Sequence, residues 1–396
     1  MTSAAPNVVY VVPDKMGGML NIVASLVAHR SGPMPHHVIL TDNRLSTDTR
    51  WGQRMAADTQ QTVRYALPVE NIYTVVDRVH RALPPGGGVL VTNDLIELAM
   101  LHRHDPGRMV VQILHGDHDY YYDLAERHQA VIDVFVAYSR VMYDTLRCRL
   151  PHRADDVVHL PYGIPLPSRT RTAAPGPLRL VFAGRLEHGQ KGVFDLPGID
   201  AALAAAGVDV RWTIIGGGPD EDELRRRWAS TRVDWAGVLP NQALLDRLAD
   251  FDVFVLPTRA EGFPVGLVEA MAAGLVPVVS DIPSGVPEVV DEGVTGLRPA
   301  VGDVAGFAAA IGALAGDRAR LDTMSGAARA AVEARFEARE RTAGYEALYA
   351  GWQTRRRPGP ARLPLPYGSR LDQPWIPNLV VRAIRTMVRT CQGKPV

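Results

Sequence analysis

The chain has 396 residues, of which 46% are hydrophobic and 22% charged. It can bury a sizeable core and is too long for a single compact unit, so we expect two domains. Its 43 basic and 43 acidic residues cancel, which gives the chain as a whole no electrostatic attraction to nucleic acid. The two cysteines, Cys148 and Cys391, exclude a disulfide scaffold and a cysteine-based zinc site, and favour a reducing compartment.

The first residues carry no basic segment ahead of the apolar run at 8–12, and no stretch approaches the roughly 18 apolar residues of a membrane span. The sequence therefore predicts a soluble, cytoplasmic protein without a secretion signal. The charge is uneven, however. Residues 355–396 contain nine basic residues against one acidic residue, Asp372.

Short apolar runs rich in β-branched residues alternate with longer helical patterns through the first half of the chain. This alternation is typical of parallel strands covered by helices on both faces, so the predicted fold class is α/β. The strands expected in this half are 7–12, 37–41, 88–92, 109–114, 131–137 and 157–160.

The segment 162–177 is rich in proline and glycine, and we expect it to be an exposed connection between domains. The predicted domains are 1–165, completed by 355–396, and 175–353. Two doubly wound, Rossmann-like units would face a cleft at the carboxyl ends of their strands, where such sheets bind ligands. In the second unit we expect strands at 178–183, 208–215, 233–236, 251–256 and 276–280, and helices at 220–229, 241–250 and 265–273.

The turn after the first strand reads PDKMGGML, and Gly17 and Gly18 there would let a ligand approach the backbone closely. A second glycine-rich turn, with Gly217 and Gly218, follows the strand at 208–215. It fails as a dinucleotide fingerprint because Glu221 stands at the third glycine position. Both segments also fit plain strand-to-helix turns.

A polar cluster, LHGDHDYYY, follows the strand at 109–114. Histidine and carboxylate side chains suit zinc or iron, so a metal site is one alternative here. A loop that is simply polar is the other. The cluster comprises His115, Asp117, His118, Asp119 and Asp123, followed by the aromatic run 120–122.

The loop after the strand at 178–183 reads GRLEHGQKG. Arg185 and Lys191 could clamp a diphosphate with a forked and a point-like cation. A nucleoside triphosphatase P-loop is excluded, because Gln190 stands where that motif needs its lysine.

Further along, AEGFPVGLVEAMAAG places two glutamates, Glu261 and Glu269, eight positions apart. Pro264 at the first turn and Gly274 just past the last turn fit the ends of a helix. A helix N-terminus offers N–H groups to an anionic ligand, and nearby carboxylates suit sugar hydroxyls. The alternative is a surface glutamate followed by a capped amphipathic helix.

The stretch EGFPVGLVEAMAAGLVPVVSDIPSGVPEVVDEGVTGLRP resembles the E-x7-E region of family 4 retaining glycosyltransferases of the GT-B fold, the glycosyl transferases group 1. The resemblance implies that Glu261 contacts hydroxyls of the donor sugar and Glu269 the nucleotide ribose. It likewise implies Arg185 and Lys191 for the donor diphosphate and His115 for the donor sugar. The family often has glycine where Pro264 stands, so contacts inferred from a backbone N–H do not transfer. The implied donor-binding residues are Gly17, Gly18, Gly217, Gly218, Phe263, Pro264, Val265, Gly266 and Glu269.

What the resemblance implies is a metal-independent transfer, without cofactor, from a nucleoside-diphosphate sugar to a hydroxyl acceptor, with retention of anomeric configuration. The acceptor would be a saccharide, a lipid-linked saccharide or a small molecule, as in polysaccharide or glycoconjugate biosynthesis. A GT-B epimerase, a phosphorylase and a non-catalytic nucleotide-sugar binding subunit are the alternatives. Candidates for the acceptor side are Lys15, Asp117, His118 and Tyr120.

The basic tail has two interpretations. Its predicted helix, 376–390, could pack onto the first domain through Leu379, Val380, Ile384, Met387 and Val388. Alternatively, its arginines could draw the protein to anionic lipid at the inner face of a membrane, near a lipid-linked acceptor. These arginines are 355–357, Arg362, Arg382, Arg385 and Arg389.

Overall fold

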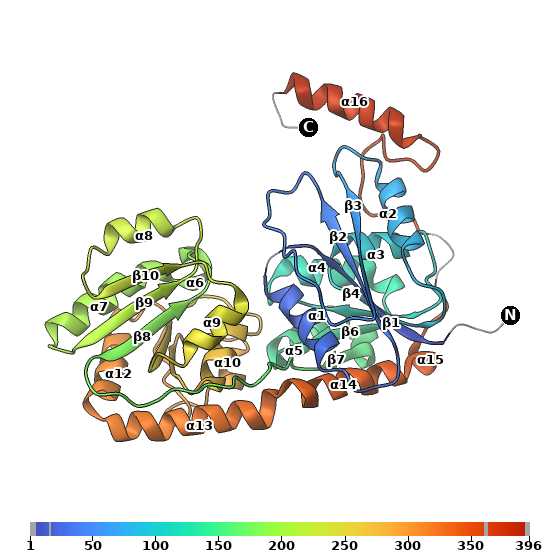
Figure 1. Ribbon diagram of the computed structural model, residues 1–396. Helices are drawn as coiled ribbons and strands as arrows, with labels where there is room; N and C mark the ends of the chain where they lie inside the picture. Colours follow the sequence, from blue (N-terminus) through green and yellow to red (C-terminus); the bar gives the residue numbers. More distant parts are fainter. Residues whose placement is uncertain (1–4, 16, 360–362, 393–396) are drawn as a thin grey trace. The chain divides into compact units, whose positions relative to one another are not determined.

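The computed structural model describes residues 5–15, 17–359 and 363–392 (Figure 1). The chain forms two compact units. Unit 1 contains the residues up to 137, then 143–160 and those from 339 onward, and unit 2 contains 138–142 and 161–338. Each unit has a parallel sheet with helices packed on it, which confirms the α/β class (Figure 1).

In its described residues, unit 1 has a seven-stranded parallel sheet in the order β3-β2-β1-β4-β5-β6-β7. The order reverses between β1 and β4, which is the point where doubly wound sheets leave a crevice at their carboxyl ends. The strands are β1 (Asn7–Pro13), β2 (His36–Asn43), β3 (Thr59–Tyr65), β4 (Gly88–Thr92), β5 (Met109–Ile113), β6 (Val134–Ala137) and β7 (Val157–His159).

All six strands predicted for this half are present, and β3 is an addition. Its sequence, TQQTVRY, is polar and mostly exposed because β3 lies at the edge of the sheet, paired only with β2. It therefore lacks the apolar run that marks a buried strand. Strand β6 begins at Val134, later than predicted, because residues 129–131 form a 3-10 turn, η1 (Gln129–Val131).

The end of the chain completes the core of unit 1. Tyr349 packs edge-on against Tyr10 of β1, with ring centroids 6.5 Å apart. The Tyr345 hydroxyl donates to the Leu160 carbonyl at 2.9 Å. The helices that lie wholly or mostly in this unit are α1 (Gly18–Ala28), α2 (Ile72–Arg81), α3 (Leu95–Leu101), α4 (Asp119–His128), α5 (Arg140–Arg149), η2 (Pro151–Asp156), α14 (Ala338–Ala350), α15 (Trp352–Arg355) and α16 (Asn378–Cys391).

Unit 2 has a five-stranded parallel sheet among its described residues, in the order β10-β9-β8-β11-β12. All five predicted strands are present: β8 (Leu178–Ala183), β9 (Val210–Ile215), β10 (Val233–Gly237), β11 (Val253–Leu256) and β12 (Val276–Val279). The three predicted helices correspond to α8 (Glu221–Arg227), α9 (Asn241–Leu248) and α10 (Val265–Ala272). The others are α6 (His188–Lys191), η3 (Val193–Asp195), α7 (Leu196–Ala205), α11 (Val286–Val289), α12 (Val304–Gly316) and α13 (Arg318–Phe336).

The proline-rich connection is irregular, as predicted, but the prediction that it is exposed is wrong at its start. Tyr162 and Ile164 are buried. The Ile164 N–H donates to the Phe336 carbonyl at 2.9 Å, and the Ala338 N–H donates back to the Ile164 carbonyl at 3.0 Å. This pairing satisfies backbone groups that could not otherwise be buried.

The expected packing of the last helix onto unit 1 through its apolar residues is also wrong. Of the side chains on α16, Val381 is buried, whereas Leu379 is 79% and Met387 67% exposed. Polar contacts hold the helix instead: Asn378 bonds to Glu70, and Arg385 pairs with Asp372. Val380, Ile384 and Val388 are exposed too, and Arg362 lies outside the described residues. Among the helices that the structure describes, none is long and apolar enough to cross a bilayer.

Candidate functional site

The structure brings together two of the predicted catalytic residues in unit 2, from motifs 70 positions apart. Lys191 Nζ lies 2.6 Å from Glu261 Oε1. The Glu261 side chain is buried, and its Oε1 also lies 3.0 Å from the Thr258 hydroxyl. An ammonium and a carboxylate therefore share one site after β8 and β11, at the carboxyl edge of the sheet.

A glycine, Gly192, allows the Lys191 and Glu261 side chains to come this close. Gly192 ends α6 with a φ of 65°, and a Cβ at that position would lie 1.8 Å from the Pro257 carbonyl oxygen. The backbone of the loop that carries Lys191 therefore approaches the loop after β11 more closely than any other residue would allow. The Arg259 N–H, which donates to the Gln190 carbonyl at 2.8 Å, joins the same two loops.

Arg185 lies outside this pair. Its side chain is 65% exposed, and its Nε lies 3.1 Å from a Glu187 carboxylate oxygen. The clamp of arginine and lysine on a diphosphate stays a prediction. Nearby, a Cβ on Gly218 would lie 2.3 Å from the Leu186 carbonyl, so this glycine is required for packing of the two turns, whatever ligand they face. Gly217 is less crowded, with Val238 its nearest neighbour.

The second motif forms the start of α10. Pro264 is the N-cap of that helix, so the helix begins at Val265, as predicted, followed by Gly266. The Phe263 ring packs against Phe336 and edge-on against Tyr162, at centroid distances of 5.4 and 6.2 Å. Phe263 therefore has a packing role, and its predicted contact with a donor is not tested by the structure.

Glu269 lies within α10, as expected, and lines a cavity of about 230 Å³ in unit 2. The cavity is closed by the proline-rich connection and by α9, with Ser168 and Gln242 among its polar groups. Burial raises the pKa of Glu269 to about 7. This carboxyl group can accordingly change its protonation state near neutral pH.

His115 follows β5 in unit 1. Its Nε2 lies 2.8 Å from Oδ1 of Asn93, whose Nδ2 donates to the Val11 carbonyl at 2.7 Å. The orientation of the amide makes the histidine Nε2 the donor. Burial lowers the pKa of His115 to about 3, so the ring is neutral at physiological pH.

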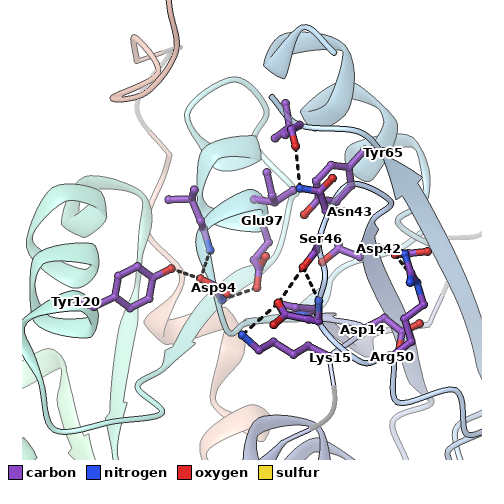
Figure 2. Close-up of a pocket in the computed structure, with 16 residues that line it drawn as sticks. Asp14, Lys15, Asp42, Asn43, Ser46, Arg50, Tyr65, Asp94, Glu97 and Tyr120 are labelled. Atoms are coloured by element: carbon purple, nitrogen blue, oxygen red, sulfur yellow. Dashed lines mark hydrogen bonds and ion pairs between the residues drawn. The ribbon is translucent and has the colours of Figure 1, made fainter. Parts of the chain in front are cut away.

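The predicted acceptor-side residues divide into two pairs. Lys15 and Tyr120 line a cavity of about 350 Å³ at the carboxyl ends of β1, β2 and β4 (Figure 2). Asp117 instead accepts a hydrogen bond from the Tyr122 hydroxyl, and His118 is the exposed N-cap of α4, beside Tyr121. Gly17 and Gly18 form the N-cap and the first residue of α1, and no atom lies within 4 Å of a Cβ built on either one.

The histidine and carboxylate cluster after β5 does not form a metal site in the structure. Across the described residues, no three His, Cys, Asp or Glu side chains converge closely enough to hold an ion. Asp119 and Asp123 pair with Arg149. The cluster is therefore engaged in contacts on α4 and α5.

The sequence analysis missed three residues that connect His115 with the cavity lined by Lys15 and Tyr120. They are Asn93, Asp94 and Glu97. They follow β4, and Asp94 with Glu97 forms a capping box at the start of α3. The spacing of an aspartate and a glutamate three residues apart before an apolar run was the available signal. Thr258, which contacts Glu261, carries no such signal.

Comparison with known proteins agrees with this geometry. Residues 177–317 match the family described as Glycosyl transferases group 1. Within unit 2, this segment contains both the Lys191 loop and the glutamate pair. Residues 177–317 belong to the group 1 glycosyl transferases.

Curated relatives match part of the chain. The glycogen synthase of Mycobacterium tuberculosis is 33% identical over 211 residues, which cover 50% of this chain and 49% of that protein. The putative colanic acid biosynthesis glycosyltransferase WcaL of Salmonella typhimurium is 37% identical over 147 residues, or 34% and 36% of the two chains. The chain thus spans about half or less of the length of these relatives.

Solved structures show the fold over more of the chain. Anabaena Alr3699/HepE in complex with UDP and glucose superposes with a TM-score of 0.70 and 16% identity, covering 87% of this chain and 100% of the other. The sucrose-phosphate synthase of Thermosynechococcus elongatus gives 0.69 and 18%, covering 87% and 98%. The α/β architecture is therefore that of GT-B glycosyltransferases.

Proposed function

We propose that this protein is a glycosyltransferase that moves a sugar from a nucleoside-diphosphate sugar to a hydroxyl acceptor in polysaccharide or glycoconjugate biosynthesis. The observation that supports it most is the Lys191–Glu261 pair in the group 1 segment. Relatives named for colanic acid and amylovoran biosynthesis, and the HepE complex with UDP and glucose, support the direction of the assignment.

The proposed roles of the charged residues follow from the charge that develops during sugar transfer. Breaking the bond between the sugar C1 and the diphosphate gathers negative charge on the leaving phosphate, and a fixed cation stabilises it. Lys191 supplies that cation, and Arg185 can supply a second one because its long, exposed side chain can leave Glu187. The proposal therefore needs no metal ion for the leaving group. It assigns the donor hydroxyls to Glu261, the ribose to Glu269, and retention of anomeric configuration to the reaction.

A donor screen tests this function. The purified chain is incubated with uridine, guanosine and adenosine diphosphate sugars, with a chelator present, and with or without a panel of saccharide acceptors. Release of nucleoside diphosphate that requires an acceptor, and that Lys191→Ala slows about 100-fold or more, supports transfer. Turnover without an acceptor indicates an epimerase or phosphorylase, and binding without turnover indicates a non-catalytic subunit.

We further propose that α16 contacts an anionic membrane surface. Among the described residues, large hydrophobic side chains that are exposed concentrate at 375–388: Trp375, Leu379, Val380, Ile384, Met387 and Val388. A cavity of about 530 Å³ with a mostly apolar lining lies between α16 and residues 67–72. An apolar face of this size on a helix anchored by polar contacts is typical of an interfacial helix.

The charge of the helix favours anionic lipid as the partner. In its 14 residues, α16 carries three arginines and no acidic residue. Arg385 is held by Asp372, whereas Arg382 is exposed on the surface of the helix. Arg356 and Arg357 pair with Asp105 and Asp156, so they contribute less to the basic patch than the sequence suggests.

Flotation with vesicles tests this contact. We expect the full chain to float with phosphatidylcholine vesicles that contain phosphatidylglycerol, and the double variant Leu379→Ser, Met387→Ser to lose flotation. Val294→Ser, an exposed valine of unit 2, is the matched control. Equal flotation of both variants contradicts the proposal, as does concentration-dependent dimerisation that the double variant abolishes without any effect of lipid.

A further inference from the structure

The 350 Å³ cavity of unit 1 lies where the strand order of the sheet reverses. Its walls come from the ends of β1 and β2, the start of α3 and, from α4, Tyr120 (Figure 2). Doubly wound sheets bind ligands at this point, often a nucleotide whose phosphates meet a helix N-terminus. The side chains that line this cavity point to a different ligand.

Two of its carboxylates are already neutralised. Asp48 lies 3.2 Å from Lys15 Nζ, and Asp42 lies 2.9 Å from Arg50 Nε. Lys15 and Arg50 are the cations that line the cavity, and each is engaged by a carboxylate. An incoming anion would have to compete for both.

Three further carboxyl groups line the cavity without an ion pair within the described residues: Asp14, Asp94 and Glu97. One oxygen of Asp14 accepts from the Trp51 N–H at 3.1 Å. Asp94 accepts from the Leu95 N–H at 2.8 Å and from the Tyr120 hydroxyl. The cavity is therefore acidic beyond what its own cations balance.

Glu97 gives the second, independent sign of a ligand. Its side chain is buried, and Oε1 accepts from the Asn93 and Asp94 N–H groups at 2.7 and 2.6 Å. Oε2 is buried as well, and in the part of the chain that the structure describes it has no hydrogen-bond partner. A buried polar atom without a partner costs about 1–3 kcal/mol unless a ligand or water satisfies it.

Resting on the proposed function, we infer that this cavity binds one sugar ring of the acceptor, uncharged or bearing an amine, through hydroxyl or ammonium groups that donate to Asp14 and Asp94 and through a hydroxyl that pairs with the free oxygen of Glu97. Rings that carry a phosphate or a carboxylate are disfavoured there. Hydroxyl donors suit an acceptor-rich lining, and an anion next to carboxylates costs several kcal/mol. The volume falls in the lower part of the range of small-molecule sites, as one ring requires.

Binding measured by ligand-observed NMR on the full chain, with UDP present, tests the inference. The probes are the methyl glycosides of glucose, galactose and mannose, each compared with its 2-amino, 6-phosphate and uronate derivatives. In at least one series we expect the uncharged or amino ring to bind at least about tenfold more tightly than its anionic derivatives. Equal or tighter binding of the anionic rings overturns the inference, and so does the absence of binding by every ring.

Variants locate the effect. Asp14→Asn and Asp94→Asn should each reduce the discrimination against anionic rings, and Tyr120→Phe, which keeps every carboxylate, should weaken binding of the uncharged ring. Asp119→Asn, exposed on α4 and outside the cavity, is the matched control. Unchanged discrimination in both aspartate variants contradicts the site.

The outcome is separable from that of the proposed function. UDP binding is measured in the same samples, with Lys191→Ala as its reference. If UDP binds through Lys191 and no ring discriminates by charge, the cavity inference fails and the transferase proposal stands. If rings bind with the expected preference and no donor binds, the transferase proposal fails.

Discussion

His115 and Glu97 are joined through a single residue, Asn93. The side-chain oxygen of Asn93 accepts from His115 Nε2 at 2.8 Å, and its backbone N–H donates to Glu97 Oε1 at 2.7 Å. The residue that the family resemblance assigns to the donor sugar is thus connected with the cavity assigned above to the acceptor. A substitution at Glu97 can therefore alter the position of His115 through Asn93, without direct contact between the two side chains.

Glu97 should make stability depend on pH in a direction unusual for a carboxyl group. Burial raises its pKa from 4.5 to about 8, so the folded chain binds a proton that the unfolded chain releases between these values. The free energy of unfolding should then fall as pH rises from about 5 to about 8, by up to about 1.4 kcal/mol per pH unit, and level off above. Glu97→Gln retains an oxygen for the two N–H donors and removes the titration. Urea unfolding of both proteins across this range should give a difference that shrinks towards acid; a constant difference would contradict the assignment.

The Lys191–Glu261 pair should behave as one unit. Lys191→Ala removes the cation and leaves Glu261 buried without its partner, so we expect turnover to fall about 100- to 1,000-fold and stability to fall by about 3 kcal/mol. In the double variant Lys191→Ala, Glu261→Ala, part of the stability should return, because no unpaired carboxylate remains. Turnover should not return. Thermal unfolding and steady-state kinetics of the full cycle measure the coupling, and additive losses in stability would rule it out.

Gly192 offers a test that leaves every charged group in place. Gly192→Ala must move the loop that carries Lys191 away from Pro257, because the new Cβ would collide with that carbonyl. Gly207 has nearly the same φ, 67°, with no atom within 4 Å of a Cβ, so Gly207→Ala reports backbone strain alone, about 1 kcal/mol. We expect Gly192→Ala to lose much more activity and stability than this control. Equal effects of the two variants would show that the close approach of the loops is unimportant.

Glu269 should couple nucleotide binding to proton release. Its pKa is raised to about 7, and ribose hydroxyls donate best to the ionised carboxylate. UDP should therefore bind more tightly as pH rises from about 6 to about 8, with release of a fraction of a proton near pH 7. Calorimetric titrations in buffers of different ionisation enthalpy measure that fraction, and Glu269→Gln should abolish it. Proton release that persists in this variant would place its origin elsewhere.

The sequence predicted the sheets well because buried parallel strands have a strong pattern. All eleven apolar runs predicted as strands are strands in the structure. Strand β3 was not predicted, because an edge strand is paired on one side and keeps polar residues such as Gln60 and Gln61. The fate of α16 could not be predicted. Its apolar periodicity fits packing equally well on protein or on lipid, and the polar contacts of Asn378 and Arg385 that hold it in the structure are tertiary contacts without a sequence pattern.

The site was predictable where residues sit in one loop and less so where loops meet. Glu261 and Lys191 were each named from local motifs, but their direct pairing depends on the close approach at Gly192, which is a tertiary contact. Glu97 was missed because a glutamate in a capping box is ordinary on the surface of a protein. Its chemistry arises only from burial beside Asp94.

The discontinuity of unit 1 bears on how the protein is made. Its seven strands are complete by residue 159, yet Tyr345, Glu346 and Tyr349 are synthesised only after unit 2. Tyr349 packs on Tyr10, and Tyr345 and Glu346 bond to residues 31, 32 and 160. While unit 2 is being translated, the ribosome holds a nascent sheet that lacks part of its cover. Any cell that produces this chain must therefore keep an exposed apolar surface from aggregating for the length of about 180 further codons, which at typical elongation rates is about 10–40 s.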